Sequence, residues 1–156
     1  MNDVTGRFLL RDKVAVVTGS SGGLGEGFAA ALAAAGAHTV LVARRERELR
    51  QVRDLIAAAG GLATAVTADI SDPAAAGRII DAAGALGGAD ILVNNAGLNY
   101  TAPAKDDDPA RFMSVVETNL LGAYQLSTAC CRSMIARQTG GCGRAYRCAG
   151  SALSMS

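Results

Sequence analysis

The sequence predicts an α/β fold in which helices cover both faces of a doubly wound, mostly parallel sheet. Short apolar runs alternate with longer alanine-rich stretches along the 156 residues, which is the pattern of repeated βαβ units. A glycine-rich turn separates the first apolar run from the first helical stretch, and Asn-Asn-Ala-Gly follows the fourth run. Half of the residues are hydrophobic but only 4% are aromatic, so we expect a core of Ala, Val, Leu and Ile side chains.

The first half of the chain supplies three expected strands and two expected helices. Each strand is a short apolar run, and each helix is a longer stretch with helical character. In chain order, these elements are a strand at 13–18, a helix at 23–35, a strand at 38–43, a helix at 45–59 and a strand at 63–68. The dipeptide Gly60-Gly61 then supplies a C-cap for the second helix.

The second half is expected to continue the alternation. A third helix begins near Ser71-Asp72-Pro73, where an N-cap candidate precedes a proline suited to the first helical turn. A fourth strand is expected at 89–93, followed by helices at about 109–117 and 119–138. The predicted strand order is about 3-2-1-4-5. Residues 1–156 show no internal repeat and no linker, so we expect a single domain.

The segment after Gly141 departs from this alternation. A fifth buried strand is expected there, yet residues 142–150 contain two arginines and no β-branched residue. Buried parallel strands are usually rich in Val and Ile. We therefore expect a sheet that is incomplete on its C-terminal side, with an irregular tail from about residue 142. Our hypothesis is a truncated or frame-disturbed version of a longer chain, prone to self-association through its uncovered sheet edge.

Composition and charge exclude several classes of function. The formal net charge is +1 and the charges are scattered, so the sequence predicts no nucleic-acid surface. No apolar run approaches the length of about 20 residues that a membrane span needs, and the polar N-terminus lacks a signal-peptide core. The four cysteines indicate neither disulfides nor a zinc site, because nothing suggests export and His38 is the only histidine. We expect a reduced, cytoplasmic protein without a bound metal.

Residues 18–25, Thr-Gly-Ser-Ser-Gly-Gly-Leu-Gly, form the most informative segment. They follow an expected strand and open an expected helix, an arrangement in which backbone N–H groups and the helix dipole hold a nucleotide diphosphate. Glycine is needed there wherever a side chain would block a close approach. The glycines at 19, 23 and 25 depart from G-x-G-x-x-G spacing. A turn that only joins strand to helix is therefore the alternative.

A second informative segment is Asn94-Asn95-Ala96-Gly97, at the end of the fourth expected strand. In open parallel sheets, ligands bind beyond the carboxyl ends of the strands. Asparagine amides placed there bridge neighbouring backbone segments, and Gly97 lets a cofactor pass close by. The alternative is a simple Asn-rich turn, because asparagine closes turns by itself and tolerates left-handed φ.

Together, the two segments resemble the paired TGxxxGxG and NNAG motifs of the short-chain dehydrogenase/reductase family. The resemblance covers about residues 8–141 and includes Ala68-Asp69-Ile70 and Thr118-Asn119-Leu120-Leu121-Gly122. It implies a Rossmann-like, three-layer α/β/α domain. It also implies an NAD(P)(H)-dependent oxidoreductase that interconverts an alcohol and a ketone by hydride transfer, and homo-oligomers among longer relatives. It identifies no substrate.

The resemblance also implies which residues bind the cofactor. In chain order these are Thr18, Gly19, Ser20, Ser21, Gly23, Leu24, Gly25, Arg44, Arg45, Asp69, Ile70, Asn95, Ala96 and Gly97. The three glycines shape the diphosphate turn, Ser20 or Ser21 donates to phosphate, and Asp69 accepts from the adenine amino group. From the residues alone, Asp69 has an alternative role as an acid favoured by a helix dipole.

The preferred cofactor follows from the end of the second expected strand. An acid there would hydrogen-bond the ribose 2′-hydroxyl of NAD and would repel a 2′-phosphate, but Ala43 occupies that place. Arg44 and Arg45 come next, and a guanidinium pairs with phosphate in a bidentate manner. The sequence therefore predicts NADP(H), with NAD(H) as the second choice. The alternative is that these arginines only form exposed pairs such as Arg44 with Glu48.

The family's proton transfer uses a serine, a tyrosine and a lysine, the last two in a YxxxK pair. In this chain the resemblance implies two catalytic residues: Asn119, which holds a water of the proton relay or merely kinks a helix, and Ser151, which orients the substrate. None of Tyr100, Tyr124 and Tyr146 has a lysine four residues later. We therefore expect little or no turnover from this chain alone. The alternative function is a non-catalytic dinucleotide-binding module or a pseudoenzyme subunit.

Overall fold

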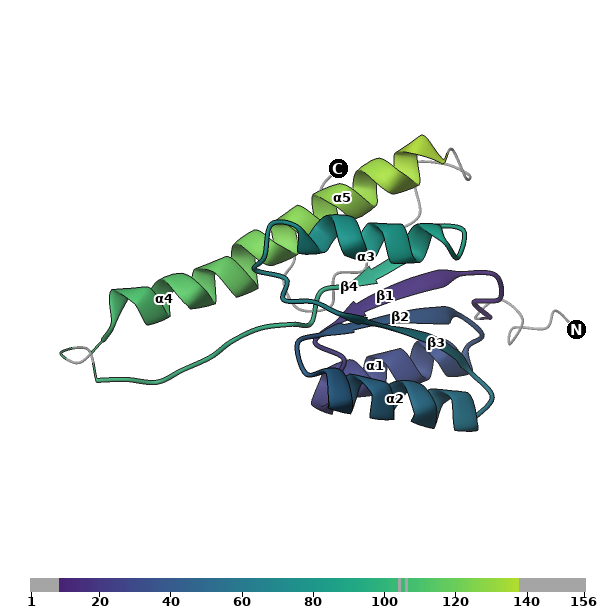
Figure 1. Cartoon of the computed structure of the whole chain (residues 1–156), viewed down its shortest axis with the longest axis horizontal. Coiled ribbons are helices and arrows are strands. Elements are labelled where there is room, and N and C mark those ends of the chain that lie inside the picture. The colour runs from purple at the N-terminus through teal and green to yellow at the C-terminus, as the bar shows by residue number, and fades with distance from the viewer. Residues whose placement is uncertain (1–8, 104, 106, 138–156) are drawn as a thin grey trace, which may run out of the picture.

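The computed structural model describes residues 9–103, 105 and 107–137, and Figure 1 shows their arrangement. Four parallel strands are hydrogen-bonded in the order β3-β2-β1-β4, which confirms the predicted parallel sheet. The strands are β1 (Val14–Thr18), β2 (His38–Ala43), β3 (Leu62–Thr67) and β4 (Ile91–Val93). The helices are α1 (Gly23–Ala34), α2 (Glu46–Ala58), α3 (Ala75–Gly84), α4 (Pro109–Val116), the π-helical η3 (Glu117–Gly122) and α5 (Ala123–Ala136). The segment expected to hold a fifth strand, 142–150, lies outside the described residues.

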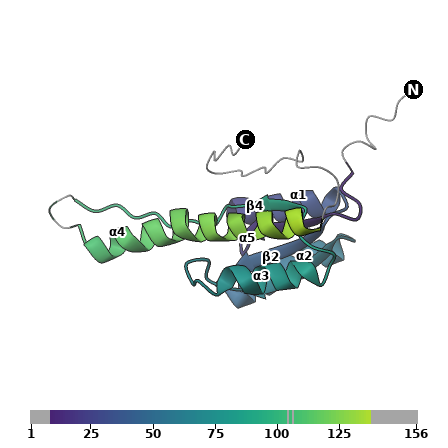
Figure 2. The same cartoon turned by 90° about the horizontal axis from the view of Figure 1, so that it is seen from above.

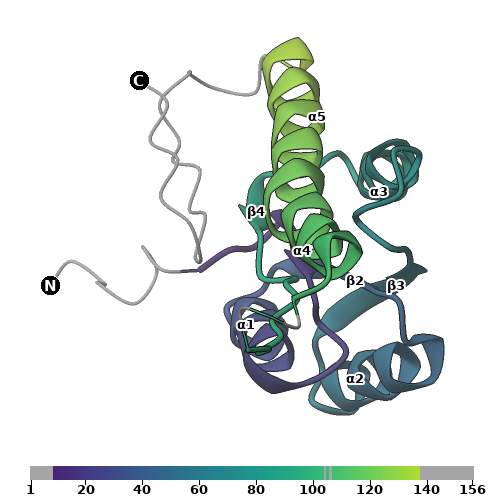
Figure 3. The same cartoon turned by 90° about the vertical axis from the view of Figure 1, so that its left-hand side faces the viewer.

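The helices form two layers, one on each face of the sheet, as Figure 3 shows. Helices α1 and α2 cover one face, and α3 and α5 cover the other. Successive side chains of a strand point to opposite faces. Val16 and Val40 accordingly belong to the core beneath α3 and α5, while Val17 and Leu41 belong to the core beneath α1 and α2. All four are fully buried, which explains why β1 and β2 are continuous apolar runs.

Two elements begin later in the chain than predicted, and in each case an aspartate side chain binds the backbone close to the start. Strand β4 begins at Ile91 rather than residue 89, because Asp90 binds the start of β1: its carboxylate accepts from the Val14 N–H at 3.0 Å. Helix α3 begins at Ala75 rather than near residue 71. The Asp72 carboxylate accepts from the Ala74 N–H at 2.9 Å and so stabilises a turn that precedes the helix.

The two helices expected at 109–117 and 119–138 are joined without a break. Backbone angles remain helical from α4 through η3 into α5, so the predicted boundary is a π-helical turn. Asp108 begins α4 by accepting from the Ala110 N–H at 2.9 Å, and Pro109 takes the first helical position. Figure 2 shows that α4 extends beyond the sheet while α5 lies along it.

Candidate functional site

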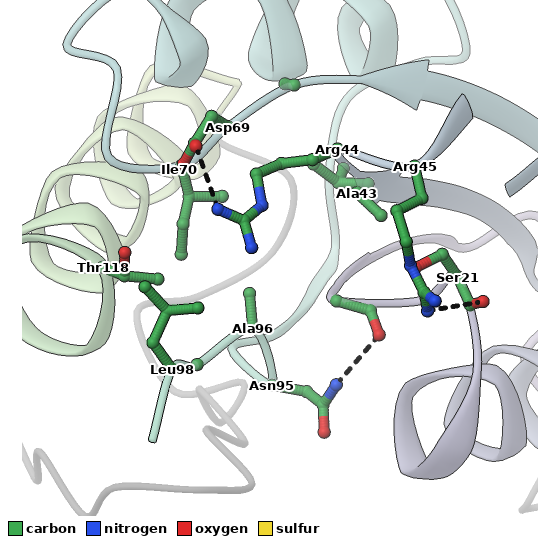
Figure 4. A pocket seen from close by; sticks show the side chains of 14 residues that line it. Ser21, Ala43, Arg44, Arg45, Asp69, Ile70, Asn95, Ala96, Leu98 and Thr118 are labelled. Carbon is green, nitrogen blue, oxygen red and sulfur yellow. Dashed lines mark hydrogen bonds and ion pairs between the residues drawn. The ribbon is translucent and has the colours of Figure 1, made fainter. Parts of the chain in front are cut away.

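A cleft of about 370 Å³ opens at the carboxyl ends of the strands. The last two residues of β2 and the segments that follow β1, β2, β3 and β4 line it, together with one residue of η3 (Figure 4). The lining residues are Gly19, Ser21, Val42, Ala43, Arg44, Arg45, Ala68, Asp69, Ile70, Asn95, Ala96, Gly97, Leu98 and Thr118. Open parallel sheets bind ligands at this edge, and small-molecule clefts have volumes of about 300–1,000 Å³.

The glycine turn after β1 depends on close backbone contacts. Gly19 has φ of 67°, and a Cβ on it would stand 2.8 Å from the Cα of Ala96. A Cβ on Gly25 would overlap the carbonyl oxygen of Gly19. Gly23 has φ of 60° and open space beside it. The first and third glycines therefore let the turn pack against α1 and the segment after β4, while Gly23 permits the backbone conformation.

Thr18 and Asn95 join the glycine turn to the end of β4. The fully buried Thr18 hydroxyl accepts from the backbone N–H groups of Asn95 and Ala96, both at 3.0 Å, and lies 3.3 Å from the Val93 carbonyl oxygen to which it donates. The Asn95 amide donates in return to the carbonyl oxygens of Thr18 at 3.1 Å and Gly19 at 3.3 Å. The two motifs singled out by sequence thus form one bonded unit at the floor of the cleft.

The two serines of the turn have different positions. Ser20 is fully buried, and its hydroxyl accepts from the Val42 N–H at 2.9 Å, so it ties the turn to β2 instead of facing the cleft. Ser21 lines the cleft and accepts from the Arg45 guanidinium, with its Oγ 3.1 Å from Nη2. Leu24 is 77% exposed at the start of α1 and does not line the cleft.

Asp69 and Arg44 form an ion pair in the part of the cleft opposite Ser21 and Arg45, with 3.5 Å between Asp69 Oδ2 and Arg44 Nη1. The other carboxylate oxygen of Asp69 accepts from the N–H of Ser71 at 3.0 Å and from its hydroxyl at 2.7 Å. Burial acts to raise the pKa of Asp69, but the Ser71 hydrogen bonds and the Arg44 guanidinium together hold it below its ordinary value. Asp69 is therefore ionised at neutral pH.

Asn119, an expected catalytic residue, lies beside the cleft without lining it. Its Oδ1 accepts from the Leu98 N–H at 2.7 Å, and its Nδ2 donates to the Leu98 carbonyl oxygen at 2.9 Å. The side-chain amide thus fixes the segment after β4 to η3. The preceding residue, Thr118, is the one that reaches the cleft. Ser151, the other expected catalytic residue, lies outside the described residues.

Several residues near the site are absent from the predicted site residues, among them Val42, Ala43 and Ala68, which line the cleft next to predicted positions. Leu98 and Thr118 line the cleft, and Ser71 holds the Asp69 carboxylate. Leu98 directly follows the Asn-Asn-Ala-Gly segment and Thr118 directly precedes Asn119, so their proximity to the motifs was the available signal. Ser71 had a signal as well, because an aspartate side chain commonly accepts from the backbone N–H two residues later in an Asx turn.

Among the residues that the structure describes, no group of three or more His, Cys, Asp or Glu side chains is arranged to hold a metal ion. No helix in this part of the chain combines the length and apolar character that crossing a membrane requires.

The first strand of this parallel sheet leads through a glycine turn into a helix, and arginines follow the second strand. This arrangement is typical of α/β proteins that bind dinucleotides. Residues 13–142 match the family model described as short chain dehydrogenase. The chain therefore belongs to the short-chain dehydrogenase/reductase family.

Individual relatives agree with this assignment. The chain is 40% identical over 134 residues to a short chain dehydrogenase of Pseudocercospora fijiensis, covering 84% of this chain and 43% of that protein. A short-chain type dehydrogenase/reductase of Mycobacterium marinum superposes with a TM-score of 0.81 at 36% identity, over 86% of this chain and 55% of that one. A metagenomic short-chain oxidoreductase in complex with NADP gives a TM-score of 0.77 at 39% identity, over 81% and 58%. The chain thus spans about half the length of the relatives that it matches.

Proposed function

We propose that the cleft binds NADP(H) and that the protein is an oxidoreductase that interconverts an alcohol and a ketone. The supporting observation is the pair Arg44 and Arg45, which line the cleft beside Ala43 at the end of β2. An acid in place of Ala43 would repel a 2′-phosphate, whereas a guanidinium binds phosphate strongly. The similarity to a short-chain oxidoreductase in complex with NADP also supports this proposal.

The residues present fit such a cofactor. The turn that ends in α1 offers backbone N–H groups for the diphosphate, because the N-cap residue Gly22 has no side chain to occupy them. Ile70, Ala96 and Leu98 give the cleft apolar surface. Thr18 holds the two binding segments at a fixed distance through its three hydrogen bonds. When bound, the nicotinamide of such a cofactor supplies or accepts a hydride.

Calorimetric titration of the purified chain with NADPH and with NADH tests this function. A charge-assisted hydrogen bond is worth about 1.5–3 kcal/mol, so we expect NADPH to bind about tenfold more tightly or better. Absence of binding by both dinucleotides, or equal affinity for the two, would contradict the proposal.

A second candidate function is dinucleotide binding without turnover. It is favoured by one observation, the lack of a lysine four residues after any tyrosine of the 156-residue sequence. Consumption of NADPH with a panel of ketones separates the two functions. Turnover supports the oxidoreductase, and tight binding with an unchanged NADPH concentration supports the binding module.

We also infer that the protein self-associates along α4, η3 and α5. Met113, Leu120, Tyr124 and Ile135 are large apolar side chains that remain about half exposed there. Light scattering during gel filtration should report a mass above that of one chain, and Leu120→Lys should reduce this mass. Leu55→Lys, at an exposed apolar position of α2, is the matched control. A monomeric wild-type chain at high concentration would exclude self-association.

A further inference from the structure

Arg137, at the end of α5, extends to the loop that joins α3 to β4. Its Nη1 donates to the carbonyl oxygens of Gly87 at 2.7 Å and Gly88 at 3.1 Å, and its Nη2 donates to the carbonyl oxygen of Ala89. Figure 1 shows that α3 and α5 end on the same side of the molecule. Three consecutive backbone carbonyls therefore converge on one guanidinium group that lies 48–50 positions later in the chain.

The loop uses its N–H groups for its own closure. The Gly87 N–H donates to the Gly84 carbonyl oxygen at 3.1 Å, and the Gly88 N–H donates to the Ala83 carbonyl oxygen at 2.8 Å. Gly87 and Gly88 have φ of 102° and 95°, which glycine adopts without strain. The loop thus keeps its donors for itself and presents its acceptors to Arg137.

These acceptors suit a cation with several N–H groups. Residues 87–89 follow the C-terminal end of α3, and a positive charge is stabilised at this end of a helix dipole. Among the described residues no ion pair includes Arg137, so carbonyl dipoles are the partners of its charge. A planar guanidinium offers five donors in fixed directions, whereas an ammonium group is a point charge with three.

The guanidinium also lies directly against the backbone of Gly88. A Cβ on Gly88 would stand 2.5 Å from Arg137 Cζ and 2.5 Å from its Nε. A Cβ on the neighbouring Gly87 would meet no atom within 4 Å. The contact with Arg137 therefore requires glycine at position 88 and not at position 87.

The loop leads into the strand with the fewest backbone partners. β4 pairs with β1 through three residues, whereas β1 and β2 pair through five, and β2 and β3 through six. Among the described strands, β1 is the only neighbour of β4. Ala89 directly precedes Asp90, which binds the start of β1, and the residues after β4 include Asn95 and Ala96 of the cleft. A contact at the start of β4 therefore reaches the cleft through a single short strand.

We propose that the backbone of residues 87–89 is a guanidinium-binding site that Arg137 fills, and that this contact fixes the start of β4 and so positions the cleft segment at its other end. Arg137 does not line the cleft. It is a positioning residue that acts on Asn95 and Ala96 through the strand. The inference is independent of which ligand the cleft binds.

Chemical rescue tests the site. We expect Arg137→Ala to lower the midpoint of thermal unfolding by about 4–10 °C, because hydrogen bonds from a charged group are lost. Methylguanidinium, at concentrations that leave the wild-type midpoint unchanged, should recover part of this loss because it binds the folded state. Urea, which is planar but uncharged, should recover none.

Arg132→Ala is the charge-matched control, because it removes an exposed arginine of the same helix. It should neither lower the midpoint appreciably nor respond to methylguanidinium. An Arg137→Ala variant that unfolds at the wild-type temperature, or that methylguanidinium does not stabilise, would overturn the site.

Amide hydrogen exchange separates positioning from a general loss of stability. Val52→Ala removes buried apolar contacts beneath α2, on the other face of the sheet, and serves as the destabilised reference. At the same interval below each midpoint, we expect the N–H groups of β4, Asn95 and Ala96 to exchange about tenfold faster in Arg137→Ala than in Val52→Ala. The N–H groups of β3 should exchange alike in the two variants. Equal exchange at Asn95 and Ala96 would show that Arg137 does not position the cleft.

Two glycine substitutions test the same contact in chains that retain Arg137. Gly87→Ala and Gly88→Ala share the strain of a side chain at positive φ, but only the second places a Cβ against the guanidinium. Gly88→Ala should therefore lower the unfolding midpoint further than Gly87→Ala does. The difference should disappear when Arg137 is also replaced by alanine. Equal midpoints of the two single variants would contradict the contact.

Discussion

The side chain of Asn119 and the backbone of Leu98 are joined by two hydrogen bonds in opposite directions, at 2.7 Å and 2.9 Å. One residue lies in the π-helical turn and the other in the segment that follows β4. The amide therefore connects the continuous helix formed by α4, η3 and α5 to a segment that lines the cleft. Because Leu98 lines the cleft, any loss of this connection is expected to loosen one of its walls.

Replacing Asn119 tests this connection. Asn119→Ala removes both hydrogen bonds, and we expect the free energy of unfolding to fall by about 1–2 kcal/mol. Asn119→Asp keeps an acceptor for the Leu98 N–H but faces a carbonyl oxygen with a carboxylate, so it should not restore stability. Urea denaturation measures the change, and faster exchange of the Leu98 amide proton would locate it. Asn99→Ala, at an exposed position next to Leu98, is the control. Equal stability of the Asn119→Ala variant and wild type would contradict the structural role.

Sequence patterns predicted the sheet well because its central strands are recognisable from their own consecutive residues. β1 and β2 lie between two helical layers, so both faces of each strand are apolar and the run is unmistakable. The π-helical turn was not predicted. It adjusts the helix so that Asn119 meets Leu98 and so that Gly122 passes the carbonyl oxygen of Ile70, where a Cβ would stand 2.5 Å away. Such a contact joins distant segments and has no local pattern.

The sequence predicted where the candidate site lies, but not which of its side chains bond to one another. Glycine and asparagine residues indicated the loops that line the cleft. Which serine faces the cleft depends on the direction that each side chain takes from the turn, and Ser20 points to β2. The pairing of Arg44 with Asp69 likewise depends on side-chain rotamers across two strands. The sequence alone instead offered a pair between Arg44 and Glu48 on one helix face.

Thr18→Val should destabilise the protein although it preserves shape. Valine fills the same buried volume but leaves the N–H groups of Asn95 and Ala96 without their acceptor. We expect a loss of about 2–3 kcal/mol in the free energy of unfolding, because unsatisfied buried donors are costly. Thr18→Ser retains the hydroxyl and should lose only about 1 kcal/mol through its missing methyl group. Chemical denaturation compares the two, and a valine variant as stable as the serine variant would refute the hydrogen-bonding argument.

Two glycines of α1 provide a matched pair of substitutions. Gly25→Ala places a Cβ against the carbonyl oxygen of Gly19, and we expect it to cost about 3 kcal/mol or more and to weaken NADPH binding. Gly27→Ala meets no atom within 4 Å and should leave binding unchanged while raising stability by up to about 1 kcal/mol. Thermal unfolding and calorimetric titration read out both effects. If Gly25→Ala binds NADPH as tightly as Gly27→Ala does, close packing of the turn is not required.

We predict that Asp69 makes the stability of the protein depend on pH, with stability rising as the pH rises. Its pKa in the folded protein lies below the ordinary value of 3.8, because the Ser71 hydrogen bonds and Arg44 outweigh the opposing effect of burial. The unfolded chain therefore binds the proton more readily, and stability rises with pH through this range. The contribution is fully present above 3.8 and is lost as the pH falls through the lower, folded value.

Asp69→Asn isolates that contribution. The variant should be less stable than wild type near neutral pH, and the difference should shrink as the solution is acidified below 3.8. Urea denaturation at a series of pH values measures it. Asp81→Asn, on the exposed part of α3, controls for the general effect of removing a carboxylate. A stability difference that stays constant with pH would show that Asp69 gains nothing from its partners.

We predict that the pKa of Tyr100, which lies before the start of α4, depends on its hydrogen bond to Asp107. Its hydroxyl donates to the Asp107 carboxylate at 2.6 Å, and this hydrogen bond raises the pKa of Tyr100 above its ordinary value of 10.0. Removing the carboxylate with Asp107→Asn should lower the pKa of Tyr100 toward that value. The Arg111 guanidinium, 5.6 Å from the centre of the ring, acts in the same direction because a nearby cation favours the phenolate. Ultraviolet titration of tyrosinate measures the shift, and Tyr100→Phe identifies which of the three tyrosines is responsible. An unchanged titration curve in the Asp107→Asn variant would mean that the loop does not hold this contact in solution.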